Sequence, residues 1–183
     1  MTSVLALSGS PSANSRTGLV AAHLVRLLAD SGATARQLPI RELPAADLLG
    51  ARFDSPEIAA ATAEVAAADG IIVATPVYQA SYTGLLKAFL DLLPQGGLAG
   101  KAVLPVATGG SLAHVLAIDY ALRPVLSALG ARHVVAGCFL LDQDILRTPD
   151  GGAEFEPAAE LRLLEALGGF TQALNSPATA LVH

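Results

Sequence analysis

The sequence predicts a doubly wound α/β fold, and three observations support this. Five apolar segments of strand length alternate with longer segments of helical periodicity. Some of the short segments, such as residues 70–74 and 134–138, are apolar or small at every position, which is typical of parallel strands covered on both faces. Hydrophobic residues make up 52% of the 183 residues, enough to bury the roughly two-thirds of the surface expected for a folded domain of this size. We expect a single domain over residues 1–174 and a tail over residues 175–183.

The apolar periodicity places the elements in order along the chain. A helix of residues 17–31 should follow the first strand, and Ser55 with Pro56 should begin the second helix as a cap and first-turn pair. Gly32 and Gly130 should end the first and fourth helices. The expected strands are residues 3–8, 34–40, 70–75, 102–107 and 133–141, and the expected helices are residues 17–31, 55–68, 83–93, 112–129 and 157–174.

Two prolines disturb this pattern. Pro105 lies inside the fourth strand, where it removes a hydrogen-bond donor and favours an edge or a bulge. Pro124 lies inside the fourth helix and leaves the carbonyl of Tyr120 without its helical partner. We therefore expect a kink or a π-bulge near Tyr120.

Composition excludes several functional classes. The net charge of −5 leaves no basic stripe for nucleic acid, and no apolar run reaches the roughly 18 residues of a membrane span. The N-terminus lacks the pattern of a signal peptide, and the single cysteine, Cys138, agrees with a reducing compartment, so we expect a cytoplasmic protein. The four histidines show no metal-ligand spacing, so we expect no metal.

The loop after the first strand, residues 9–16, predicts an anion site. It is rich in hydroxyl groups and precedes a helix N-terminus, where free N–H groups and the helix dipole attract negative charge. Ser10, Ser15 and Thr17 can donate hydrogen bonds, and Arg16 suits bidentate phosphate contact. Dinucleotide and triphosphatase glycine motifs are absent, which leaves a phosphomonoester of a mononucleotide. The alternative is an ordinary Ser-rich turn that caps a helix.

The loops after the third and fourth strands could receive a flat heterocycle. The Gln79 amide and tyrosine faces can contact a ring, although Tyr78 and Tyr82 could simply be buried against helices. Glycines in the other loop allow a close approach, although a simple turn explains them equally well, and His114 is the histidine best placed to touch a ligand. The candidate residues are Pro76, Val77, Tyr78, Gln79, Ala80, Ser81, Thr108, Gly109, Gly110, Ser111 and His114.

With these loops in place, the chain resembles the NADPH-dependent FMN reductases of the flavodoxin-like superfamily. Within that family it is most similar to the flavin-reducing components of two-component alkanesulfonate monooxygenase systems. The resemblance is carried by GSP at 9–11, SR at 15–16, TPVY at 75–78, SYTGLLK at 81–87, DLLP at 91–94, LPVATGG at 104–110, AH at 113–114 and DYALRPVL at 119–126. It fades after Leu141, so residues 142–156 could differ in substrate details.

The resemblance implies a flavodoxin-like three-layer sandwich with a five-stranded parallel sheet in the order 2-1-3-4-5. It implies that Ser10, Ser15 and Arg16, next to Thr17, hold the FMN phosphate, that residues 76–81 line the isoalloxazine, and that residues 108–111 complete the pocket. Hydride passes from NADPH, or NADH, to FMN, so no catalytic side chain or metal is needed. It further implies a homo-oligomer, dimer or tetramer, with Tyr120 in a π-bulge at a subunit contact.

Three functions remain to be compared. A diffusible-flavin reductase would supply reduced FMN to a monooxygenase in sulfonate or sulfur assimilation, and the absence of Trp suits a flavin that must leave. A flavoprotein that retains FMN to reduce quinones, chromate or azo dyes would share the fold. A non-catalytic electron carrier usually has a more acidic surface than 16 acidic against 11 basic residues provide.

Overall fold

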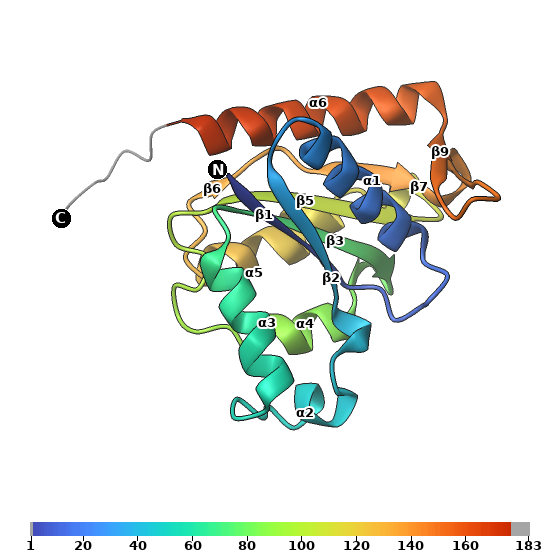
Figure 1. Cartoon of the computed structure of the whole chain (residues 1–183). Coiled ribbons are helices and arrows are strands. Elements are labelled where there is room, and N and C mark those ends of the chain that lie inside the picture. The colour runs from blue at the N-terminus through green and yellow to red at the C-terminus, as the bar shows by residue number, and fades with distance from the viewer. Residues whose placement is uncertain (1, 177–183) are drawn as a thin grey trace.

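A parallel sheet forms the middle layer of the computed structural model, which describes residues 2–176 (Figure 1). The five predicted strands are all present, and the order of the sheet confirms the flavodoxin-like topology. From one edge to the other the strands are β2 (Thr34–Pro39), β1 (Ser3–Ser8), β3 (Gly70–Tyr78), β5 (Ala102–Gly109) and an outer strand in two pieces, β6 (His133–Val134) and β7 (Cys138–Leu141). All pairings among these strands are parallel.

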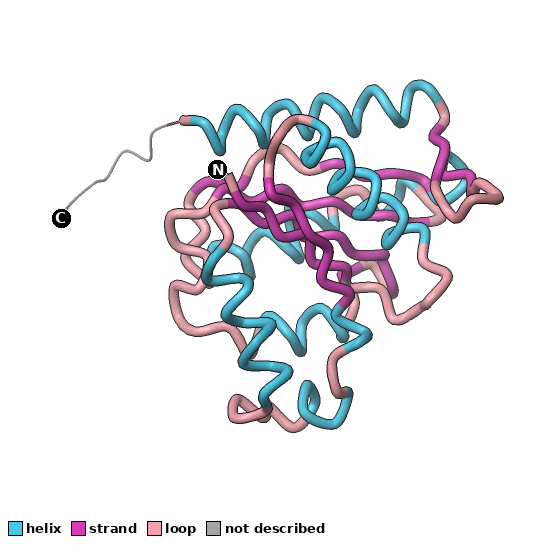
Figure 2. Tube along the Cα trace, viewed as in Figure 1, coloured by secondary structure: helices cyan, strands magenta, loops and turns pink. Residues whose placement is uncertain are grey.

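Helices cover both faces of the sheet, as Figures 1 and 2 show. One face carries α1 (Arg16–Asp30) and α6 (Pro157–Asn175), and the other carries α3 (Pro56–Ala67), α4 (Gly84–Leu90) and α5 (Arg123–Ala128). Successive residues of a strand point to opposite faces, so Val4 packs with α1 and α6 while Leu5 packs with α3 and α4. This explains why the central strands are apolar at every position.

Several short elements were not predicted, because each is too short for a recognisable period. They are a 3-10 turn at Ile40–Glu42, α2 (Ala45–Leu49), β4 (Ser81–Tyr82), 3-10 turns at Leu112–His114 and Asp142–Asp144, and the antiparallel hairpin of β8 (Ile145–Arg147) and β9 (Ala153–Phe155). The side chain of Ser55 does not cap α3, since its hydroxyl donates to Glu57. The expected tail begins at Asn175, which is instead the last residue of α6, and residues 177–183 lie outside the described part.

Pro105 coincides with the interruption of the outer strand. Val103 pairs with Val134 and Val106 pairs with Cys138. The outer strand therefore advances by four residues where β5 advances by three. The carbonyl of Val103 accepts the N–H of Val135, so the alternate residue Pro105 faces the same neighbour and has no N–H to offer it. The predicted single strand over residues 133–141 is therefore two strands with an extra residue between them, and the expected bulge lies in the partner of the proline.

Pro124 has the effect that the sequence predicts. The expected helix over residues 112–129 is divided into the 3-10 turn, a π-helix at Ile118–Leu122 and α5. The N–H of Arg123 donates to the carbonyl of Ile118, five residues back, which is the π-type hydrogen bond. Tyr120 lies in the π-helix and is 78% exposed. The prediction of a π-bulge at this tyrosine is confirmed.

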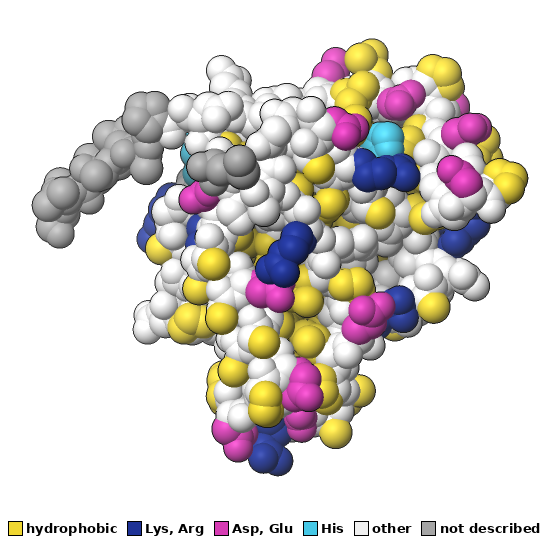
Figure 3. Space-filling view, viewed as in Figure 1, with side chains coloured by type: hydrophobic (Ala, Val, Ile, Leu, Met, Phe, Trp, Pro, Cys, Tyr) yellow, Lys and Arg dark blue, Asp and Glu magenta, His cyan; other side chains and the backbone are white. Residues whose placement is uncertain are grey.

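Acidic and basic side chains are interspersed on the face drawn in Figure 3, without a broad patch of one sign. Across residues 2–176, no helix is both long enough and apolar enough to cross a membrane.

Candidate functional site

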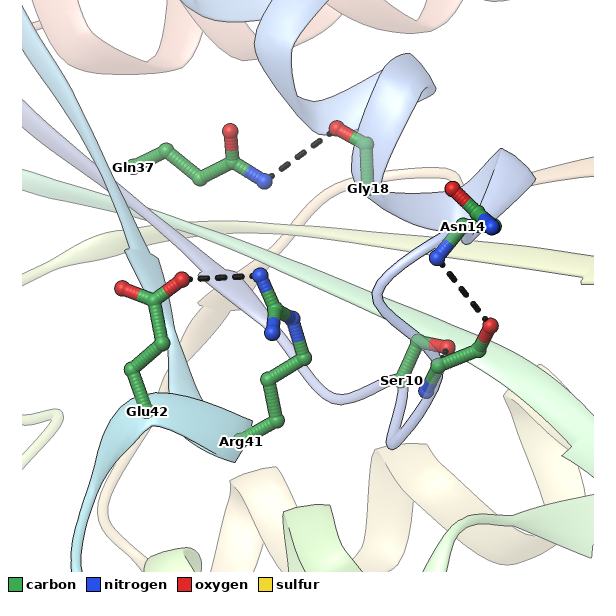
Figure 4. Close-up of polar contacts among 7 residues, drawn as sticks. Ser10, Asn14, Gly18, Gln37, Arg41 and Glu42 are labelled. Carbon is green, nitrogen blue, oxygen red and sulfur yellow. Dashed lines mark hydrogen bonds and ion pairs between the residues drawn. The ribbon is translucent and has the colours of Figure 1, made fainter.

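Three loops meet at the carboxyl edge of the sheet. They follow β1, β3 and β5, which are adjacent strands, so the sheet brings together residues that are far apart in the sequence. In this fold class, ligands bind where such strand ends diverge. Figure 4 shows the first of these loops between β1 and α1, with the end of β2 beside it.

The first loop keeps its hydroxyl protons free. The N–H of Ser12 donates to Ser10 Oγ at 3.3 Å, the N–H of Asn14 donates to Ser12 Oγ at 3.2 Å, and Ser15 Oγ caps α1 by accepting from the N–H of Gly18 at 3.1 Å. These oxygens act as acceptors. The O–H groups of Ser10 and Ser15 have no acceptor among residues 2–176 and can donate to an anion.

Hydrogen bonds of threonine hydroxyl groups connect the three loops. Thr17 Oγ1 and Thr108 Oγ1 share a hydrogen bond of 2.7 Å, which joins the start of α1 to the end of β5. Thr83 Oγ1 donates to the carbonyl of Gly9 at 2.5 Å, and the N–H of Thr83 donates to Thr75 Oγ1 at 3.2 Å. Thr17 and Thr108 were predicted to contact a ligand; in the structure both are buried and their hydroxyl groups bond to each other.

Sequence reasoning missed Thr75 and Thr83 as parts of the site. The available signal was their position. Thr75 is buried near the end of β3, and Thr83 is the N-cap of α4, where its hydroxyl accepts the N–H of Leu86 at 3.1 Å. A hydroxyl at a strand end or a helix start bonds to backbone in many folds. Only the tertiary structure shows that the same hydroxyl of Thr83 also reaches the first loop.

The second loop is a two-residue hairpin turn. Tyr78 pairs with Ser81, so Gln79 and Ala80 form the turn with φ values of 48° and 62°. Positive φ at both central residues is the geometry of a tight hairpin, where glycine or asparagine is usual, so this turn is strained. Tyr82 packs on the core beneath α4, while Tyr78 is 51% exposed.

The third loop, residues 108–111, differs in packing at its two glycines. A Cβ on Gly109 would lie in tight contact with Phe139, 3.0 Å from its Cζ, whereas a Cβ on Gly110 would meet nothing within 4 Å. The residues after this loop line a cavity of about 450 Å³ between the hairpin tip and the π-helix. It is lined by Ala80, Ala113, His114, Leu116, Ala117, Tyr120 and Ala121.

Arg16 is exposed at the start of α1. Its Nε donates to the carbonyl of Ile145 at 3.4 Å, which leaves both terminal guanidinium nitrogens available for a ligand. A second arginine that the sequence did not single out, Arg41, lies in the 3-10 turn after β2, as Figure 4 shows, and pairs with Glu42 at 2.8 Å. Ser10 and Ser15 thus belong to the first loop, while the side chain of Arg16 is directed toward the hairpin of β8 and β9.

A second cavity, of about 670 Å³, lies beyond the 3-10 turn at Leu112–His114 and reaches α6. Cys138 contributes to its wall, and burial raises the pKa of the Cys138 thiol to about 11. The thiol is protonated at neutral pH and is a poor nucleophile. No group of three or more His, Cys, Asp or Glu in residues 2–176 is arranged to hold a metal ion.

Residues 2–145 match the family model of NADPH-dependent FMN reductases. The chain belongs to this family. An FMN reductase (NADPH) of Pseudomonas putida is 48% identical over 172 residues, which cover 93% of this chain and 87% of that protein. An FMN reductase (NADPH) of Escherichia coli is 44% identical over 94% of this chain and 90% of its own length.

Solved structures agree with this family assignment. The apo form of an NADH:FMN oxidoreductase, EmoB, has a TM-score of 0.87 and 44% identity, with 97% of this chain and 92% of that chain covered. The NADH-dependent FMN reductase SfnF of Pseudomonas putida is 35% identical over 92% of both chains. Some of these relatives are thus named for NADPH and others for NADH.

Proposed function

We propose that this chain catalyses the reduction of FMN by NAD(P)H. In balanced form, NAD(P)H, one proton and FMN give NAD(P)⁺ and reduced FMN. The proposal rests on the way in which three loops are connected. The hydroxyl-rich first loop, which has free donors, is bonded through Thr17 and Thr108 to the glycine loop after β5. It is also bonded through Thr83 to the segment that follows the strained hairpin. Such a site has donors for a phosphate at one end and room for a flat ring at the other.

The residues present fit FMN. Ser10, Ser15 and Arg16 would hold the phosphate through two hydroxyl donors and a guanidinium group at the N-terminus of the 15-residue helix α1. Residues 76–81 and 108–111 would flank the ring, with Gly110 open on its outer side. FMN supplies the electron-accepting ring when bound. The protein would bring two flat substrates together and exclude water, which requires no nucleophile.

We further propose that reduced FMN leaves the protein for a partner monooxygenase in sulfonate or sulfur assimilation in the cytoplasm. The resemblance to the reductases of two-component systems supports this. The assembly would be a dimer or tetramer, with the exposed Tyr120 of the π-helix at a subunit contact.

Steady-state oxidation of NADPH and NADH, followed by absorbance with and without added FMN, tests the activity. Turnover that depends on FMN and saturates with it is expected. Oxidation that needs a quinone or azo dye, while added FMN has no effect, would favour a flavin-retaining reductase. A chain that takes no electrons from either nicotinamide would favour an electron carrier.

A further inference from the structure

The hairpin of β8 and β9 and the loop over residues 9–15 hold each other by reciprocal contacts. Arg16 donates from the end of the loop to the carbonyl of Ile145 in β8. The guanidinium group of Arg147, also in β8, donates in the other direction to the carbonyl of Asn14. Two segments about 130 residues apart are thereby joined at the predicted phosphate site.

The hairpin is a fixed support for this contact. Ile145 is buried in the core between α1 and α6, and the ring of Phe155 in β9 packs on His23 of α1 with centroids 4.8 Å apart. The N–H of Glu156 donates to the carbonyl of Asp144, which closes the base of the hairpin at 2.9 Å. Arg147 therefore reaches the loop from an anchored strand.

The carbonyl that Arg147 holds belongs to the peptide that joins Asn14 to Ser15. In a planar trans peptide the C=O and the N–H point in opposite directions. A guanidinium group on the Asn14 carbonyl therefore turns the Ser15 N–H away from the hairpin. Within residues 2–176 the Ser15 N–H has no hydrogen-bond acceptor, and the hydroxyl proton of the same residue has none either, since Ser15 Oγ accepts from the N–H of Gly18.

The charges around this loop are not compensated. Within the described residues neither Arg16 nor Arg147 forms an ion pair, and both are held by neutral carbonyl oxygens. Two guanidinium groups against one loop, in a chain of net charge −5, favour a ligand with two negative charges. A phosphomonoester is such a ligand.

We propose that Arg147 is a positioning residue for the phosphate of FMN. It acts through the Asn14–Ser15 peptide, aims the Ser15 N–H as a donor and adds positive charge, so that it favours FMN over riboflavin. This inference rests on the proposed function for the identity of the ligand. Because Arg147 lies beyond residues 2–145, this part of phosphate recognition is outside the segment that the family model matches.

Binding of FMN and of riboflavin to Arg147→Ala, measured by titration without nicotinamide, tests the proposal. We expect about a tenfold weaker affinity for FMN, the size of one lost hydrogen bond, and an unchanged affinity for riboflavin. Arg147→Lys, which keeps a charged donor, should recover most of the loss. Arg132→Ala, at an exposed arginine that forms no ion pair with the described residues, is the matched control and should bind both flavins as the unaltered protein does.

A second measurement separates positioning from charge. On addition of inorganic phosphate, the amide signal of Ser15 in a ¹⁵N-labelled sample should shift in the unaltered protein and much less in Arg147→Ala. An unchanged FMN affinity, or equal losses for both flavins, would overturn the proposal. So would weaker FMN binding with a normal Ser15 shift, since charge alone would then explain it. Failure of the unaltered protein to reduce FMN would instead count against the proposed function, because the binding comparison does not need turnover.

Discussion

Thr83 shows how much of the site depends on single hydroxyl groups. It is 3% exposed, and its side chain bonds to the carbonyl of Gly9 and to the N–H of Leu86. Valine has nearly the same shape but would leave both backbone groups buried without a partner. The first loop would then lose its hydrogen bond to the start of α4.

We therefore expect Thr83→Val to lower the free energy of unfolding by about 2 kcal/mol, and also to weaken FMN binding. Denaturant unfolding and flavin titration measure the two effects. Thr62→Val is the control, because that exposed hydroxyl bonds only to Ala59 within its own helix, and it should change stability by less than about 0.5 kcal/mol. Equal effects of the two substitutions would contradict the proposal that the Thr83 hydroxyl holds the first loop in place.

Arg16 is the charged residue that the sequence alone places at the phosphate. A hydrogen bond to a charged group contributes about 1.5–3 kcal/mol, so Arg16→Ala should weaken FMN binding by roughly 10- to 150-fold. Riboflavin has no phosphate and should bind nearly as before. If titrations showed the same loss for both flavins, Arg16 would act on the fold and not on the phosphate.

Sequence reasoning found the polar residues of the site but not their connections. The pattern around Ser10, Ser15 and Arg16 is local, because a strand, a hydroxyl-rich turn and a helix start follow one another. Arg147 had no such signal, since its contact with Asn14 depends on where a hairpin 133 residues further along the chain packs.

Among the elements, the π-helix at Ile118–Leu122 contributes Tyr120 and Ala121 to the wall of the cavity near Ala80. A π-helix loses regular hydrogen bonding, and such irregularities are retained mostly at functional sites. Deletion of Tyr120 should restore α-helical winding and leave the protein folded. The flavin edge of the pocket could then close, so we expect tighter FMN retention, an altered assembly and loss of multiple-turnover flavin reduction.

Light scattering and steady-state NADPH oxidation measure these effects of the deletion. Replacement Tyr120→Ala keeps the length of the helix and is the control for the missing side chain. A deletion variant with the oligomer size and turnover of the unaltered protein would show that Tyr120 is only a packing residue.

His23 of α1, which packs on Phe155 of β9, makes the stability of the protein depend on pH. Burial lowers the pKa of His23, the charge of Arg26 acts in the same direction, and Glu160 opposes both. Below about pH 6.5 the unfolded chain takes up a proton at this residue more readily than the folded chain does. Stability therefore falls as the pH drops through this value toward the lower pKa of the folded state.

His23→Gln removes the titration, so its unfolding midpoint should depend less on pH between about pH 7 and pH 5. Thermal unfolding at several pH values compares this variant with the unaltered protein. An identical slope in both would mean that His23 is protonated as easily in the fold as outside it.

At the scale of the whole molecule, the fold was predictable because its central strands are buried on both faces. Continuous apolar runs such as Ile71–Ile72–Val73 identify them without knowledge of their partners. The divided outer strand was not predictable, because its interruption depends on Pro105 of the neighbouring strand. The β8–β9 hairpin was missed for the same reason, since its stability comes from packing against α1.

The small number of aromatic residues in the chain affects how firmly it can retain a flavin. The chain has no Trp, and Tyr78 is exposed at the tip of the second loop, so little aromatic surface encloses a bound ring. Protein purified without added flavin should be mostly colourless, as its absorption spectrum after gel filtration would show. A stoichiometric yellow chromophore would contradict release and favour the flavin-retaining alternative.

The placement of α6 has a consequence for the newly made chain. Phe170 and Leu174 close over Gly70 so tightly that a Cβ there would lie 2.8 Å from Phe170 Cζ and 2.5 Å from Leu174 Cδ2. All five strands leave the ribosome before this helix does. Until residues 157–175 follow, the face of the sheet that carries Ile72 and Leu104 lacks the cover of α6, so the nascent protein exposes an apolar strip between the emergence of the last of these strands and that of this helix.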